Sequence, residues 1–238
     1  MYDITKLVQN VSSHTAVNNR FFELWLNNEL SAKQLEIFAR NYWEWAHRFP
    51  EAIALLIAIS DDYMTRAEYT KTLHSEIGYG RADKIHSHLF ENFYDQLIAK
   101  VTPSNIVTLC QLRNKKEVLP ETTKLVNWEK ETYFSDKLAA AGAQLAIEWQ
   151  AYTMIRLLYE GARNYRYLWS NQDEFHEACE FFYVHIGEAE KQHKEESFNA
   201  AKQLVTTDAA YEKLSLGFER HLELIATFWE ALAAKIET

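Results

Sequence analysis

LAAAGAQLAIEWQAYTMI, the stretch Leu138–Ile155, is the part of the chain from which the fold and the site can be argued. Its only charged side chain is that of Glu148, and the residues three and four positions away supply no countercharge along a helix: Gln144, Leu145, Ala151 and Tyr152. A bare charge in so apolar a helix is costly to bury, so Glu148 must be protonated, paired or bound to a cation. The partner of Glu148 is therefore the central question about this protein.

Few helix breakers interrupt the rest of the chain. Its 238 residues include only 6 Gly and 3 Pro, which favours long helices joined by short turns. No stretch alternates as a strand does, and neither an internal repeat nor a low-complexity linker is present. The pattern predicts an all-α fold, a single-domain bundle of about seven helices over residues 1–238.

Local signals set several boundaries within this bundle. The capping-box pattern at Ser31–Gln34 starts a helix, and Pro50 marks its break. We then expect one helix over residues 51–77, ended by the glycines that follow it. A long helix or a helix pair should cover residues 121–167, and a cap at 206–208 should begin the last helix.

Composition excludes several classes of function. The formal charge of -9 argues against nucleic-acid binding, and the basic residues are too scattered for a membrane patch. No run is long and apolar enough to span a membrane. Cys110 and Cys179 form neither a metal motif nor a disulfide framework, and no signal segment is visible, so we expect a soluble cytoplasmic protein. The apolar surroundings of Cys110 predict a small core residue rather than a nucleophile.

Aromatic residues make up 14% of the chain and include 7 Trp. Such content indicates either a large aromatic core or an aromatic-lined pocket, and stripes of aromatic residues usually pack in a core.

Two clusters could supply metal ligands beside Glu148. Glu76 and His86 straddle a glycine break, so helical periodicity cannot decide whether they converge or lie on the surface. His74 and His88 lie close by in the sequence and compete with any single choice. Mixed nitrogen and oxygen ligands of this kind would favour iron or manganese over a thiolate zinc site.

The second cluster is HIGEAEKQH, residues 185–193. On a regular helix His193 is rotated by about 80° from His185 and Glu190 by about 140°, whereas Glu188 shares the face of His185. A single π-bulge would bring His185, Glu190 and His193 together, and such bulges are frequent at functional sites. The alternative is a polar, exposed helix end. Di-metal bundle proteins carry histidine and carboxylate ligands at such short spacings along their helices.

Glu44 is a further candidate, but its helical neighbours are Arg40, Asn41, His47 and Arg48. That environment favours a solvated, salt-bridged face over a ligand position.

Four segments, in order along the chain, resemble the haem-oxygenase-like di-iron oxygenases, a family of seven-helix proteins that bind no haem. YWEWAHRFPEAIALL resembles an early helix in which aromatics precede Phe-Pro. EIGYGRADKIHSHLFENF resembles their Glu, Gly-rich break and His before Leu-Phe. EWQAYTMIRLLYEG resembles their second Glu helix, with Gly161 thirteen residues after Glu148, and FFYVHIGEAEKQH resembles their last ligand helix.

Carried over by position, the resemblance implies that the metal ligands are Glu76, His86, Glu148, His185 and His193. The family usually has His, three residues, Asp, two residues and His in its last ligand helix. This chain has four residues before Glu190 and Glu in place of Asp, which leaves Glu188 as a rival. Glu44 would be the additional early-helix carboxylate of some members.

The resemblance implies two irons, O₂ and an external electron donor acting on a small-molecule substrate. Members oxidise amine nitrogens, cleave carbon–carbon bonds of amino or fatty acids, or rearrange amino acids. One cyanobacterial member turns a halogenated tryptophan into an indole nitrile. We therefore expect an oxygenase of an amino-acid-like substrate in natural-product biosynthesis, with the choice between Fe/Fe and Mn/Fe open.

Three alternatives stay open from the residues. The same fold hosts thiamin-degrading enzymes, which need a nucleophilic cysteine in a polar pocket, and a cofactorless oxidase of quinone biosynthesis. A non-enzymatic helical protein that binds a small ligand would need a partner for Glu148, such as His86, His185 or Arg156.

A homodimer is also an expectation, because all-α chains of this size often associate through an apolar helix face.

Overall fold

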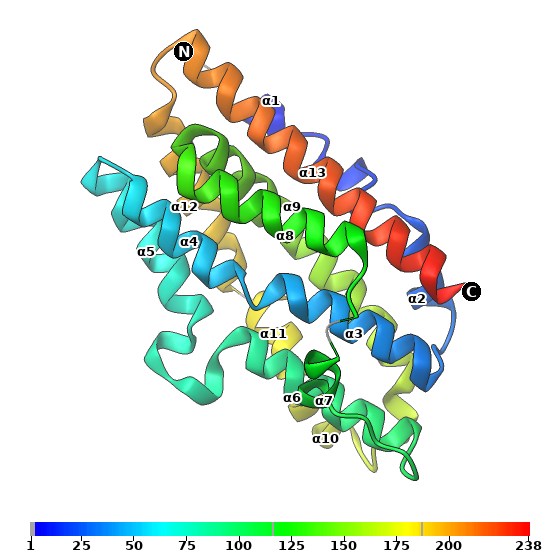
Figure 1. Cartoon of the computed structure of the whole chain (residues 1–238). Helices are drawn as coiled ribbons and strands as arrows, with labels where there is room; N and C mark the ends of the chain where they lie inside the picture. The colour runs from blue at the N-terminus through cyan, green and yellow to red at the C-terminus, as the bar shows by residue number, and fades with distance from the viewer. Residues whose placement is uncertain (1–2, 116, 187) are drawn as a thin grey trace.

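The structure of the chain is a computed structural model that describes residues 3–115, 117–186 and 188–238, without the side chains of residues 188–191. Regular structure in these ranges is helical throughout, with no β-strand (Figure 1). The α-helices are α1 Thr5–Val8, α2 Arg20–Asn27, α3 Ala32–Ala46, α4 Phe49–Ile59, α5 Tyr63–Glu76, α6 His86–Val101, α7 Leu109–Asn114, α8 Pro120–Ser135, α9 Lys137–Ala162, α10 Gln172–Ala178, α11 Glu180–Ile186, α12 Glu188–Leu204 and α13 Asp208–Ile236.

The predicted all-α bundle is confirmed, although the helices are more finely divided than expected. The expected single helix over residues 51–77 is wrong: α4 ends at Ile59 and α5 begins at Tyr63. Asp62 caps α5, because its carboxylate accepts from the backbone N–H groups of Met64 and Thr65. The region over 121–167 contains the expected helix pair, α8 and α9, with Asp136 as the cap between them.

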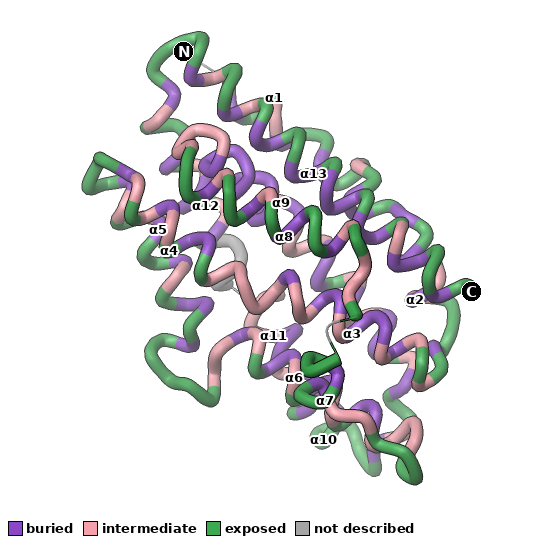
Figure 2. Tube along the Cα trace, in the orientation of Figure 1, coloured by how far each residue is buried: buried purple, intermediate pink, exposed green. Residues whose placement is uncertain are grey.

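Helix α9, which carries Glu148, packs against α13, α12, α2, α11 and α8. Residues 140–148 of this helix are all buried (Figure 2). Close approach to α13 depends on two glycines: a Cβ on Gly142 would lie 2.0 Å from the Leu214 carbonyl oxygen, and one on Gly217 would lie 2.1 Å from that of Ala139. The helix that carries the lone charge is thus the inner helix of the bundle.

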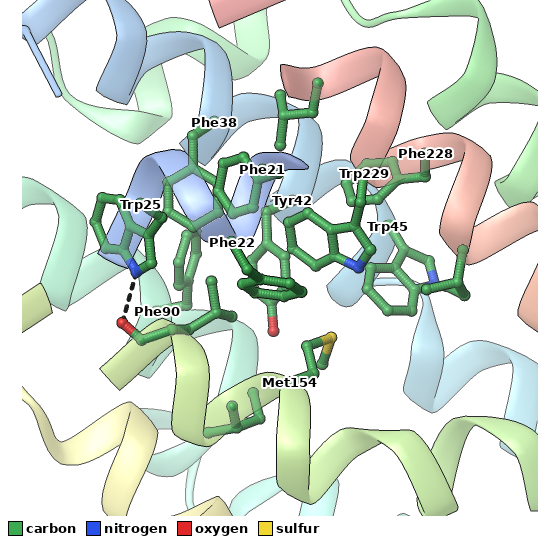
Figure 3. Close-up of a cluster of buried hydrophobic side chains, with 14 of the residues drawn as sticks. Phe21, Phe22, Trp25, Phe38, Tyr42, Trp45, Phe90, Met154, Phe228 and Trp229 are labelled. Atoms are coloured by element: carbon green, nitrogen blue, oxygen red, sulfur yellow. Dashed lines mark hydrogen bonds between the residues drawn. The ribbon is translucent and has the colours of Figure 1, made fainter. Parts of the chain in front are cut away.

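Aromatic side chains fill the space between α2, α3, α9 and α13 (Figure 3). The rings of Phe21 and Trp229 stack with their centroids 4.7 Å apart. The indole nitrogen of Trp25 donates to the Leu158 carbonyl at 2.8 Å, and Gly161 leaves room for that ring. Most of the unusual aromatic content is therefore core, as aromatic stripes usually are.

Candidate metal centre

Glu76, His86 and His185 bring one ligand atom each to within 4.8 Å of one another. Glu76 is the last residue of α5 and His86 is the first of α6, so the loop between them must fold back sharply. Gly78 permits this with φ +66°, and a Cβ there would lie 2.4 Å from the backbone carbon of Lys84. The glycine break kept helical periodicity from deciding whether Glu76 and His86 converge. In the structure, this same break brings them together.

One nitrogen of this trio lacks the hydrogen bond that a buried polar group normally has. His86 Nδ1 lies 2.9 Å from Glu76 Oε2. The two atoms are not aligned for a hydrogen bond, so this buried nitrogen has no hydrogen-bond partner among the described residues. Both residues are only 6% exposed. A cation between such atoms would satisfy both lone pairs, so the donor set fits a metal ion.

His185 is oriented by its own helix. Its Nδ1 lies 2.6 Å from the carbonyl oxygen of Phe181, and because a carbonyl only accepts, Nδ1 must carry the proton. The other ring nitrogen then has a free lone pair, which is the usual arrangement of a histidine that binds metal. Burial, followed by the charge of His86, lowers the pKa of His185 to about 3, so the ring is neutral near pH 7.

Neighbouring histidines lower the pKa of the Glu76 carboxyl group. Burial raises the pKa of this carboxyl group, but His86, His185 and His193 outweigh burial and lower it to about 2. An ionised carboxylate beside a neutral imidazole is the protonation state that metal binding requires.

Glu148 is buried at 2% exposure, and Gln144 donates to its Oε1 at 2.6 Å. Its Oε2 lies 3.8 Å from Nδ1 of His193, which is 5% exposed on α12. An imidazole on α12 and an amide one turn earlier on α9 therefore both lie beside the lone charge. The search for a countercharge passed over that amide because it is neutral.

One cavity joins these groups. Glu76, His86, Glu148 and His185 line it together with Ser87 and an apolar wall made of Tyr42, Trp45, Ala46, Phe49, Ile147, Ala151, Met154, Ile155 and Phe181. It measures about 60 Å³, which is room for about four water molecules at about 15 Å³ each. Tyr42 and Met154 belong to facing helices, α3 and α9 (Figure 3). The polar groups therefore converge at one part of an otherwise apolar space.

The structure does not bring Glu44 to this group. Its Oε1 accepts from Arg48 at 3.2 Å on a half-exposed face, the salt-bridged alternative of the sequence analysis. The cavity positions of α3 and the start of α4 are Tyr42, Trp45, Ala46 and Phe49, a helical stripe that excludes position 44. The side chains of Glu188 and Glu190 lie outside the described residues. The predicted π-bulge falls on a segment that includes Gly187, also outside them, and stays a prediction.

A further buried carboxylate was missed by the sequence analysis. Glu129 of α8 is 4% exposed, and its Oε1 accepts from the indole nitrogen of Trp45 at 2.9 Å and from His221 Nε2 at 2.8 Å. The sequence signal was weak, because Glu129 follows Trp128 in a helix with many exposed charges. Trp45 connects this cluster to the wall of the cavity.

Neither cysteine lines the cavity. Cys110 is exposed, so the prediction of a core position is wrong; the apolar residues beside it, Leu109 and Leu112, take the core positions of α7 instead. Cys179 is buried, and burial raises the pKa of its thiol to about 12, which makes it a poor nucleophile.

A helical bundle that gathers imidazoles and carboxylates beside an apolar cavity is similar in design to the bundle proteins that bind metal between their helices. A model of the family described as iron-containing redox enzyme matches residues 36–226. The chain belongs to this family.

Solved structures share the haem-oxygenase-like fold over nearly the whole chain. A CADD-like protein of unknown function from Nostoc punctiforme superposes with a TM-score of 0.78 at 14% identity, covering 98% of this chain and 96% of that chain. A domain of unknown function with a heme oxygenase-like fold from Shewanella denitrificans gives 0.74 at 15% identity, covering 100% and 94%. A TenA homologue from Pseudomonas syringae gives 0.73 at 16% identity, covering 96% and 91%. At these identities the similarity shows the fold alone.

Among curated proteins, a stretch of 129 residues is 30% identical to mov-10-B.1 of Danio rerio, which is named as a helicase. The match covers 51% of this chain but only 12% of that protein, so it carries no argument about activity. In the described part of the chain, no helix combines the length and the apolar character that crossing a bilayer requires.

Proposed function

We propose that the chain is a non-haem di-iron oxygenase or oxidase that uses O₂ and an external electron donor to oxidise or rearrange a small amino-acid-like substrate. The observation that carries the proposal is the trio of Glu76, His86 and His185, whose ligand atoms lie within 4.8 Å of one another and in which the buried His86 Nδ1 has no hydrogen-bond partner among the described residues. Glu148 and His193 supply a second carboxylate–imidazole pair on facing helices. Membership of a family of iron-containing redox enzymes supports iron as the metal.

The residues that would hold two irons are Glu76, His86, Glu148, His185 and His193, with Glu190 or Glu188 as the remaining carboxylate. When bound, iron would supply the activation of O₂ that organic side chains cannot perform. Glu76, which is ionised, and His185, which is neutral, present lone pairs without first losing a proton. Carboxylates suit iron because they can bridge two ions and change their binding mode.

The chain's own apolar residues would bind the substrate and exclude water. Tyr42, Trp45, Phe49 and Phe181 surround the polar groups, and no Lys or Arg is among the described residues of the cavity wall. An aromatic or aliphatic side chain fits this wall. A space for about four waters is smaller than an amino acid, so binding requires rotation of wall side chains such as the flexible Met154. A tryptophan-derived, nitrile-forming reaction is one form of this proposal.

The TenA homologue among the similar structures raises the thiamin-degrading alternative. That chemistry needs a nucleophilic thiol in the pocket, and the positions of Cys110 and Cys179 do not supply one.

The test is metal content together with O₂ reactivity. The protein is purified without oxygen, loaded with Fe(II), assayed for iron per chain and mixed with O₂ while its visible spectrum is followed. Near two irons per chain, with O₂ consumed and a spectral change, is the expected result, and a screen of amino acids would then begin with tryptophans. Glu148→Gln should reduce the iron count, whereas the matched control Glu44→Gln should not. A folded protein that binds no iron would refute the proposal.

A further inference from the structure

Behind Glu148 lies a short chain of buried hydrogen bonds. Gln144, one turn earlier on α9, donates from its amide nitrogen to Glu148 Oε1 at 2.6 Å. The phenol of Tyr133 on α8 donates to the amide oxygen of Gln144 at 3.1 Å. Gln144 is 0% exposed, Tyr133 is 1% exposed and Glu148 is 2% exposed, so water does not compete for these groups.

The direction of each hydrogen bond follows from the chemistry of the groups. The amide nitrogen of Gln144 can only donate, and it lies against Glu148 Oε1, which accepts. The amide oxygen then faces Tyr133, which must donate. Burial, followed by the charge of Glu129, raises the pKa of the Tyr133 phenol well above 10, so its proton stays in place. Reversing the amide would set its oxygen against the carboxylate and break the bond to Glu148.

The consequence is that the two oxygens of Glu148 are no longer equivalent. Oε1 accepts from Gln144, and Oε2 is the oxygen that lies 3.8 Å from His193 Nδ1. We propose that Tyr133 and Gln144 are positioning residues that fix the orientation in which the Glu148 carboxylate would bind a metal. This inference rests on the proposed function, since it assigns a role toward the metal that the site would hold.

Tyr69 provides a matched control. It is a fully buried tyrosine on α5, and Glu148 adds to the effect of burial in raising its pKa, so both tyrosines lie near the same carboxylate. The Tyr69 hydroxyl has no hydrogen-bond partner among the described residues. Tyr69→Phe and Tyr133→Phe therefore remove the same atom from similar surroundings, but only the second removes a bond that orients Gln144.

The experiment uses Co(II) as the probe, with binding measured by titration and the visible absorption spectrum recorded for each protein. Gln144→Met, which keeps an unbranched side chain but has no amide, should lower Co(II) affinity by about 10- to 100-fold. Tyr133→Phe should lower it by about 10-fold. Both variants should change the shape of the Co(II) spectrum, because Glu148 could then bind through either oxygen. Tyr69→Phe should keep the wild-type affinity and spectrum.

Circular dichroism and thermal unfolding of each variant separate misfolding from loss of positioning. A variant that is less stable but binds Co(II) with the wild-type affinity and spectrum would show that Gln144 and Tyr133 are structural only, which would overturn the inference and leave the metal site intact. Equal losses in Tyr69→Phe and Tyr133→Phe would also overturn it. Failure of the wild-type protein to bind Co(II) would overturn the proposed function and this inference together.

Discussion

Replacing Gly142 by alanine should destabilise the bundle at the crossing of α9 and α13. The added Cβ would lie 2.0 Å from the Leu214 carbonyl oxygen, whereas ordinary contact begins at 3.4 Å. The obstacle is the backbone of a facing helix, so no side chain can rotate away. Overpacking of this kind costs about 1–3 kcal/mol, and the upper end applies against backbone. Alanine's higher helix propensity returns about 1 kcal/mol.

The net loss should therefore be about 2 kcal/mol in the free energy of unfolding. For a chain of this size that corresponds to a decrease of about 4–8 °C in the midpoint of thermal unfolding. Urea unfolding, followed by circular dichroism, measures the same loss in free energy. Gly80→Ala is the control for the substitution itself, because its Cβ would meet nothing within 4 Å and its φ of +83° imposes only a backbone cost of about 1–2 kcal/mol.

Gly217, the second glycine at this crossing, allows a further test of the close approach. A Cβ on Gly217 would lie 2.1 Å from the Ala139 carbonyl oxygen at the same crossing. If α9 and α13 move apart to accommodate one methyl group, they also make room for the other. The Gly142→Ala/Gly217→Ala double variant should therefore lose less stability than the sum of the two single losses. If Gly142→Ala unfolded at the wild-type midpoint or above it, the close approach of α9 and α13 would be wrong.

Three further predictions concern buried and half-buried polar groups. Glu129→Ala should lower the free energy of unfolding by about 2–4 kcal/mol in urea, because Trp45 and His221 each lose a buried acceptor; Glu129→Gln, which keeps an acceptor oxygen, should lose less. Glu44→Ala should leave the iron count unchanged and shift stability by less than about 1 kcal/mol, since its ion pair is partly exposed; a reduced iron count would restore it as a ligand. Burial lowers the pKa of His47 below 6.5, so the unfolded chain binds more protons and stability falls as the pH drops below 6.5; His47→Gln should lessen that fall between about pH 7.5 and about pH 5.

The helical class was predictable because it depends on local signals. Ser31 caps α3 with Gln34 as expected, and Thr207 caps α13 from within the predicted window. The break between α4 and α5 was missed, although Asp62 is a capping residue, because an apolar run followed by helix-forming residues reads as one continuous helix. Such a cap is visible in the sequence, but its use depends on α4 and α5 packing against each other.

The candidate site was predictable only in part. Glu148 could be singled out because one charge in an apolar helix is a local anomaly. The convergence of Glu76 with His86 depends on the left-handed turn at Gly78, which a sequence permits but does not impose. Gln144, Tyr133 and their link to Glu148 left no local anomaly, since buried amides and phenols are common and their partners lie on different turns and helices.

Two buried carboxylates in this bundle show how a structural role differs from a ligand role. Glu129 accepts hydrogen bonds from protein donors: an indole N–H and an imidazole nitrogen both lie within hydrogen-bond distance of its Oε1. Glu148 accepts a hydrogen bond from Gln144 on Oε1, and its Oε2 lies 3.8 Å from His193 Nδ1, at ion-pair distance. A buried polar atom without a hydrogen-bond partner is costly, and a fold retains one where something else completes the group. His86 Nδ1 is such an atom among the described residues, because it lies 2.9 Å from Glu76 Oε2 without forming a hydrogen bond, and a cation would supply the partner.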